Sequence, residues 1–105
     1  MTIIAKAWNN GAHHRSGAGY GIRISKRDKY LFRGMKSIQL RLNGCRGEFQ
    51  VNINKKSFWS PKCGELISQR IGMWLIDNGF RHWNRNPPEL ILNNVLEVRL
   101  KTGKR

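Results

Sequence analysis

The residues best suited to chemistry stand close together in a glycine-rich stretch, residues 11–21 (GAHHRSGAGYG). Its four glycines allow the backbone to turn amide groups towards an anion. Arg15 and Ser16 add hydrogen-bond donors beside the paired imidazoles of His13 and His14. The stretch is therefore suited to contact a phosphate group. Its spacing matches neither a dinucleotide-binding fingerprint nor a P-loop, because no Gly-Lys-Ser or Gly-Lys-Thr follows.

Imidazoles in such a loop can also move protons. A histidine titrates near neutral pH, so His13 or His14 can act as acid or base in phosphodiester cleavage, and Arg15 can stabilise the developing charge. A metal-independent (ribo)nuclease or toxin-like enzyme built around these residues is therefore one alternative for the function. The candidates for the second proton-transfer group are His82, Glu48 and Tyr20.

Metal ligands are present by residue type but not by spacing. His13, His14, Cys45, Cys63 and His82 are spread over about seventy residues, with no Cys-x-x-Cys and no His-x-x-x-His. The six acidic residues form no Asp-x-Asp cluster, which argues against a two-metal nuclease. The sequence therefore predicts no metal site and no cofactor.

Charge is the strongest compositional signal. The 105 residues include 20 Lys and Arg against six Asp and Glu, a net charge of +14. Residues 1–60 hold twelve of the basic residues and only two of the acidic ones. A polyanion relieves such self-repulsion, so nucleic acid, DNA or RNA, is the predicted partner. We favour binding over catalysis, and an interaction or inhibitor protein that grips an acidic protein partner is a third interpretation.

Basic residues interleaved with aromatic ones predict the interface, in which cations follow phosphates and aromatic faces receive unpaired bases. Tyr30 and Trp83 are flanked by charged residues and are the predicted stacking platforms, whereas Trp74 is predicted to be core. The predicted phosphate contacts are concentrated in the N-terminal half: Arg15, Arg23, Lys26, Arg27, Lys29, Arg33, Lys36 and Arg41.

Hydrophobic periodicity predicts the elements that position these side chains. Ser60 is a suitable N-cap and Pro61 suits the first helical turn, so the apolar spacing that follows predicts one main helix over about residues 61–77. Asn78-Gly79 is typical of a helix end, and Asn93-Asn94 suits the turn of a closing C-terminal hairpin. Period-two alternation predicts short strands near residues 3–8, 22–24, 38–42, 49–53, 90–92 and 96–100.

These elements predict an α+β fold over residues 1–105 as a single domain, with an antiparallel sheet of about five or six strands packed against the one helix. The longest apolar stretch, residues 71–76, is interrupted by Gly72 and is too short to span a membrane. The first six residues lack the apolar core of a signal peptide. We therefore expect a soluble cytoplasmic protein without membrane contact, in which Cys45 and Cys63 stay reduced.

Overall fold

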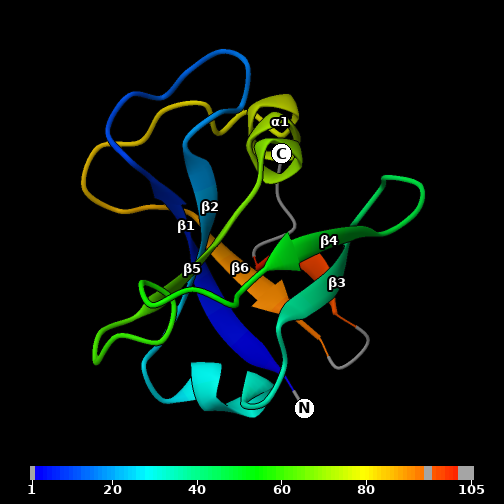
Figure 1. The fold of residues 1–105 in the computed structure, drawn as a ribbon. Coiled ribbons are helices and arrows are strands. Elements are labelled where there is room, and N and C mark those ends of the chain that lie inside the picture. The colour runs from blue at the N-terminus through cyan, green and yellow to red at the C-terminus, as the bar shows by residue number, and fades with distance from the viewer. Residues whose placement is uncertain (1, 94–95, 102–105) are drawn as a thin grey trace.

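The structure, a computed structural model, describes residues 2–93 and 96–101 (Figure 1). In that part of the chain, seven strands, one α-helix and a short 3-10 helix (η1) follow one another. The strands are β1 Ile3–Asn9, β2 Tyr20–Ile24, β3 Ser37–Leu42, β4 Phe49–Asn52, β5 Gly64–Ile67, β6 Glu89–Leu92 and β7 Glu97–Leu100. The helices are η1 Asp28–Phe32 and α1 Gln69–Asp77.

All seven strands belong to one curled sheet with the order β4-β3-β7-β6-β1-β2-β5. Neighbouring strands run antiparallel except β3 and β7, which are parallel, with Arg41 opposite Glu97 and Leu42 opposite Val98. The edge strands β4 and β5 approach each other, so the sheet is nearly a barrel (Figure 1). The helix α1 packs against β2.

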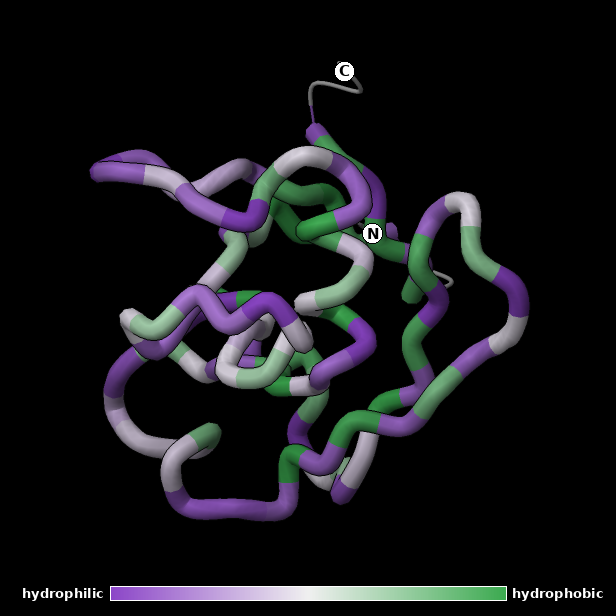
Figure 2. Tube along the Cα trace, turned by 90° about the horizontal axis from the view of Figure 1, so that it is seen from above, coloured by the Kyte–Doolittle hydropathy of each residue, from purple (hydrophilic) through white to green (hydrophobic). Residues whose placement is uncertain are grey.

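Alternation of apolar and polar residues places the core inside the curled sheet. Along β3, Ile38, Leu40 and Leu42 are buried, whereas the residues between them are exposed. Figure 2 shows the same alternation of hydrophobic and hydrophilic positions along the strands. The helix adds Trp74 and Leu75 to this core. Because each strand supplies one apolar face, burial of those faces drives the sheet to curl around its core.

The predicted helix over residues 61–77 is wrong in its first half. The chain forms β5 there, which pairs with β2, and the helix begins only after Ser68. Ser68, rather than the predicted Ser60, is the N-cap, and its hydroxyl accepts a hydrogen bond from Arg70 N at 3.2 Å. The predicted helix end is confirmed, since Asn78 is the C-cap.

The error has a physical reason: the apolar residues before the helix fit two periods. Leu66 and Ile67 lie at helical spacing from the core residues of α1, but they are also neighbours in a strand, whose side chains alternate. Pairing with β2 decides between the two, because it buries Leu66 and leaves Ile67 41% exposed on the outer side. Cys63, directly before β5, is half-buried.

The unpredicted strand β5 raises the number of strands to seven, where five or six were expected, and the parallel β3–β7 pair departs from the expected antiparallel sheet. The mixed α+β class with one main helix is confirmed. The closing hairpin is also confirmed, since β6 and β7 are antiparallel with Ile91 opposite Arg99. Asn94 of its predicted turn lies outside the described residues. Among the described helices, none is both long and apolar enough for a membrane span.

The loop between β1 and β2, residues 10–19, rests on α1 through two glycines. A Cβ added to Gly72 would overlap the carbonyl oxygen of Gly17. A Cβ on Gly17, whose φ is +88°, would lie 2.6 Å from the carbonyl oxygen of Gln69. The Gln69 side chain adds a hydrogen bond from Nε2 to Ser16 O at 2.9 Å. The two backbones therefore touch, which side chains at these glycine positions would prevent.

Candidate nucleic-acid interface and histidine cluster

A histidine from the β1–β2 loop meets residues of the loop that follows α1. Asn9, at the end of β1, organises the first loop, because its Oδ1 accepts hydrogen bonds from Gly11 N at 2.7 Å and from His13 N at 3.0 Å. His13 has a φ of 52°, a left-handed conformation that is uncommon for a residue other than glycine. The loop thus holds His13 in one defined position.

Two hydrogen bonds fix the second loop, one to the first loop and one to β2. Arg81 Nε donates to His13 O at 3.2 Å. The hydroxyl of Tyr20, a fully buried residue at the start of β2, donates to Arg81 O at 2.5 Å. His82 and Trp83 follow directly in the chain, so fixing the backbone of Arg81 brings both of their rings to His13.

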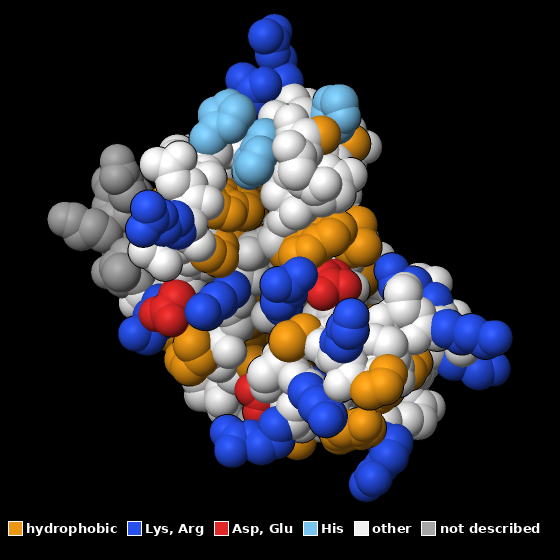
Figure 3. All heavy atoms as spheres, turned by 90° about the vertical axis from the view of Figure 1, so that its left-hand side faces the viewer, with side chains coloured by type: hydrophobic (Ala, Val, Ile, Leu, Met, Phe, Trp, Pro, Cys, Tyr) orange, Lys and Arg blue, Asp and Glu red, His pale blue; other side chains and the backbone are white. Residues whose placement is uncertain are grey.

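We call the resulting group the histidine cluster: His13, Tyr20, Arg81, His82 and Trp83. The centroid of the His13 ring lies 5.1 Å from that of His82, 5.1 Å from that of Trp83 and 5.9 Å from that of Tyr20. His82 is exposed, whereas His13 and Trp83 are half-buried. Figure 3 shows the histidines gathered at one end of the molecule.

The environment of His13 favours its neutral form. Burial is the main cause that lowers the pKa of His13 below its ordinary value of 6.5, and the charges of His82 and Arg81 lower it further. A hydrogen bond with the backbone of Gly11 acts in the opposite direction. Among the described residues, the Nε2 atom of His13 is buried and has no hydrogen-bond partner. His13 is therefore a neutral base at pH 7, with one ring nitrogen free to accept a proton.

Only some of the candidate catalytic residues lie close together in the structure. His13 lies in the cluster together with His82 and Tyr20, two of the three predicted proton-transfer partners. The third candidate, Glu48, lies in the loop between β3 and β4. His14 and Arg15 are exposed on the β1–β2 loop.

A second region carries most of the predicted phosphate contacts. We call residues 26–36, which join β2 to β3 and contain η1, the basic segment (Figure 1). Exposed large apolar groups beside cations are the combination that base stacking and phosphate contact require. Its exposed cations are Lys26, Arg27, Arg33 and Lys36. Its exposed apolar side chains are Tyr30 at 48%, Leu31 at 49% and Met35 at 43%.

The loop between β4 and β5 extends this surface. The ring centroid of Tyr30 lies 6.4 Å from that of Trp59, so this loop runs beside η1. It adds two exposed cations, Lys56 and Lys62. Of the two predicted stacking residues, Tyr30 is therefore the one on an open basic surface, whereas Trp83 packs partly on the core.

The prediction that Lys29 contacts phosphate is wrong. Its side chain is fully buried, and Nζ donates to the carbonyl oxygens of Phe58, at 2.9 Å, and of Ser60 and Lys62. An ammonium group has three donors, so three carbonyl acceptors satisfy it completely. None of the three ion pairs among the described residues involves Lys29. This lysine therefore organises the β4–β5 loop from inside.

Two further predicted contacts stand on strands of the sheet. Arg23 of β2 is half-exposed, but its Nε forms an ion pair with Glu65 at 3.2 Å, so part of its charge is already neutralised. Arg41 of β3 is exposed. The unpaired positive charge available to a ligand is therefore denser on the basic segment than on the strands.

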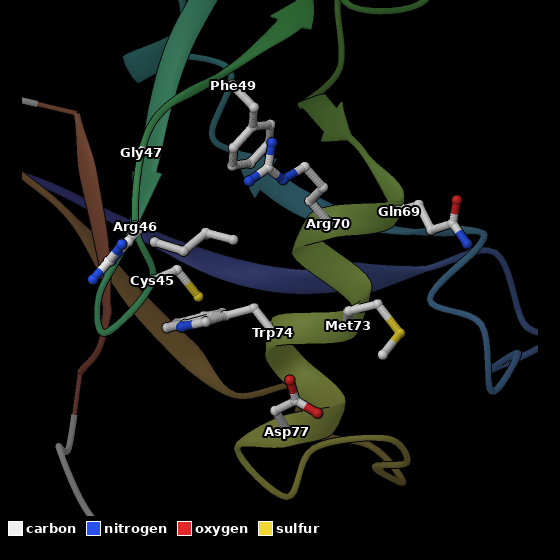
Figure 4. Close-up of a pocket in the computed structure, with 10 residues that line it drawn as sticks. Cys45, Arg46, Gly47, Phe49, Gln69, Arg70, Met73, Trp74 and Asp77 are labelled. Atoms are coloured by element: carbon white, nitrogen blue, oxygen red, sulfur yellow. The ribbon is translucent and has the colours of Figure 1, made fainter.

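A groove of about 300 Å³ separates the β3–β4 loop from α1 (Figure 4). The guanidinium of Arg70 lies over the Phe49 ring, 4.9 Å from its centroid, and Arg46 and Met73 add to the walls. The indole N–H of Trp74 is already bonded to Asn43 O at 2.9 Å. Across the part of the chain that the structure describes, no group of three or more His, Cys, Asp or Glu could hold a metal ion.

Sequence reasoning did not foresee the roles of Asn9 and Arg81. An Asn directly before a glycine-rich loop is a turn signal, so the position of Asn9 could have indicated how the loop begins. The contact of Arg81 with His13 joins residues 68 positions apart in the sequence, and no local sequence pattern predicts it.

Comparison with protein-family models, with curated proteins and with solved structures gave no match for this chain. The assignment of a function therefore depends on the geometry and charge described above.

Proposed function

We propose that this protein binds single-stranded nucleic acid through the basic segment, with Tyr30 as a stacking platform. The observation that carries the proposal is the exposure of Tyr30, Leu31 and Met35 among exposed cations that form no ion pair in the described structure. Three large apolar side chains at 43–49% exposure in one short segment are unusual on a surface without a ligand.

The two kinds of side chain would act on different parts of the ligand. Lys26, Arg27, Arg33 and Lys36 attract the phosphates, and the net charge of +14 accelerates the encounter. The ring of Tyr30 accepts a base that is free to leave its stack. Bases in a duplex are already stacked, so the aromatic contribution is restricted to single strands.

The test is a binding titration with labelled single-stranded DNA and RNA and with a duplex, over a range of salt concentrations. If about five phosphates are neutralised, the slope of log K against log salt on a single strand is roughly −3.5. Tyr30→Ala is expected to weaken binding to single strands by about 1–3 kcal/mol for each stacked base and to leave binding to the duplex unchanged. An affinity that does not change with salt would contradict the proposal.

A matched pair of double variants separates local contact from overall charge. Arg27→Gln with Arg33→Gln removes two unpaired cations of the basic segment, whereas Arg99→Gln with Lys101→Gln removes two cations that are paired with Glu97 and Glu89. Both variants lose the same net charge. The first is expected to reduce the salt slope by about 1.4, and the second by much less. Equal effects would place the binding surface elsewhere.

An acidic protein partner would use the same cations but would not need an unpaired base. Competition distinguishes the two partners. Defined single-stranded oligonucleotides should displace the labelled strand at lower concentration than heparin-like polyanions of equal charge. If both competitors displace the labelled strand equally, and Tyr30→Ala binds as wild type does, an acidic protein partner is favoured and the proposal is contradicted.

A further inference from the structure

We propose that the histidine cluster cleaves RNA without a metal ion, with His13 as the general base and His82 as the general acid. The cluster belongs to the end of the molecule formed by the β1–β2 loop and the loop after α1, whereas the basic segment lies at the opposite end (Figure 1). The inference takes its substrate class from the proposed function, but the residues that carry it are different ones.

The first support is the way in which His13 is held. Its backbone is fixed on both sides, because Asn9 Oδ1 accepts from His13 N and Arg81 Nε donates to His13 O. Its Nε2 is buried and has no hydrogen-bond partner among the described residues. A buried ring nitrogen without a partner costs free energy in a resting protein, so such an atom needs an explanation. A proton acceptor kept free for a substrate hydroxyl supplies one.

A second titratable group stands next to the first. The ring centroids of His13 and His82 lie 5.1 Å apart, so one phosphodiester group can reach both imidazoles. His13 is half-buried and His82 is exposed, and this difference assigns the roles. Burial favours the neutral form of His13 that a base requires, and the exposed position of His82 lets it reach the leaving oxygen of a substrate. Since Nε2 of His13 is buried in the resting structure, cleavage requires a side-chain movement that opens this atom to an incoming hydroxyl.

A permanent positive charge completes the arrangement. The guanidinium of Arg81 is fixed beside His13, and the buried Tyr20 holds its backbone through the hydroxyl-to-carbonyl bond. A cation in this place stabilises the additional negative charge that develops on a phosphate under attack. Trp83, whose ring lies 5.1 Å from that of His13, forms an apolar wall that limits access of water.

The reaction balances with these groups alone. His13 Nε2 takes the proton from the ribose 2′-hydroxyl, and the 2′-oxygen forms a bond to the adjacent phosphorus. The bond from phosphorus to the 5′-oxygen of the next nucleotide breaks, and that oxygen receives a proton from His82. The products are a 2′,3′-cyclic phosphate and a free 5′-hydroxyl end. Because the nucleophile is the 2′-hydroxyl, DNA is not a substrate.

The test is incubation of a labelled single-stranded RNA with the protein in excess chelator, with identification of the product ends by mass. Wild type is expected to produce 2′,3′-cyclic phosphate ends from RNA and to leave an all-deoxy strand of the same sequence intact. His13→Gln and His82→Gln should each lower the rate by about 10²-fold or more. His14→Gln is the matched control, since His14 is the exposed neighbour of His13, and its rate should equal that of wild type.

Intact RNA after incubation with wild type overturns the inference, and so does cleavage that persists at the wild-type rate in His82→Gln. The exposed position of His82 makes its variant expected to fold even if His13→Gln does not. A binding titration with the all-deoxy strand keeps the two proposals apart. If the protein binds this strand but does not cleave RNA, only the catalytic inference is contradicted. If neutralising Arg27 and Arg33 leaves cleavage unchanged, only the role of the basic segment is contradicted.

Discussion

The histidine cluster and the basic segment use polar groups in opposite ways. At the cluster, hydrogen bonds fix the backbone: Asn9 Oδ1 accepts from His13 N, Arg81 Nε donates to His13 O, and the Tyr20 hydroxyl donates to Arg81 O. In the basic segment, four cations stand in solvent, and only the buried Lys29 has fixed partners. Electrostatic affinity depends on the number of charges and changes little when their positions shift, whereas proton transfer requires exact positions of the reacting groups. The two proposals follow this difference, with electrostatic attraction assigned to the basic segment and proton transfer to the histidine cluster.

The largest effect is expected within the basic segment, where two lysines three positions apart have opposite roles. Lys29→Met should lower the free energy of unfolding by about 3 kcal/mol or more, because it removes the shared donor of the buried Phe58 carbonyl and the part-buried carbonyls of Ser60 and Lys62. Lys26→Met, at an exposed position, should change stability by no more than about 0.5 kcal/mol and should weaken binding to nucleic acid. Urea unfolding and the salt titration measure the two effects. If Lys29→Met is stable but binds nucleic acid poorly, the result would support a direct contact between Lys29 and phosphate.

A smaller effect is expected where the histidine end rests on the helix. Alanine normally favours a helix over glycine by about 1 kcal/mol, but a Cβ on Gly72 overlaps the carbonyl oxygen of Gly17. Gly72→Ala should therefore destabilise the protein by roughly 1–3 kcal/mol and displace the loop that carries His13. RNA cleavage should fall, while binding of the all-deoxy strand should stay as in wild type. Asp77→Ala, at an exposed position of the same helix, is the control and should leave all three properties unchanged.

The smallest effect concerns the stability of the histidine end at acid pH. Burial, together with the charges of His82 and Arg81, lowers the pKa of His13 below 6.5 in the folded protein, while Gly11 opposes the shift. The unfolded chain thus takes up a proton at this residue at higher pH than the folded protein does. Stability should decrease as the pH falls from about 6.5 through the lower folded-state pKa, and His13→Gln should reduce that decrease. Urea midpoints at several pH values provide the measurement, with His14→Gln as control. Parallel curves for wild type and His13→Gln would show that His13 has no lowered pKa.

The strands were predictable from the sequence where one face of the strand is buried and the other is exposed to solvent. Residues 38–42 and 49–53 alternate cleanly, and β3 and β4 follow that alternation. Residues 64–67 were not predictable in the same way, because Leu66 and Ile67 satisfy a helical period as well and only the pairing with β2 settles the choice. The parallel pairing of β3 with β7 is a tertiary result that no local pattern contains.

For the candidate sites, too, local sequence predicted some residues, and only the fold reveals the others. The sequence singled out His13 for its residue type, and it named His82 as one of three partners without a reason to prefer it. The preference comes from the fold, which places the two ring centroids 5.1 Å apart. Lys29 was misjudged because a lysine in a run of charged residues normally points into water. Its burial depends on three carbonyls of a loop about thirty residues later in the chain.

Strand β7 sets the order in which a growing chain can complete this fold. In the described structure, the β3–β4 hairpin is hydrogen-bonded to the other strands only through β7, whose residues are synthesised about fifty positions after it. During translation, β1, β2 and β5 can pair as soon as Ile67 has left the ribosome, whereas the hairpin waits with its apolar face uncovered until Leu100 emerges. The hairpin therefore keeps an unprotected sheet edge until β7 is available, and the pairing of β3 with β7 is a long-range step that slows folding.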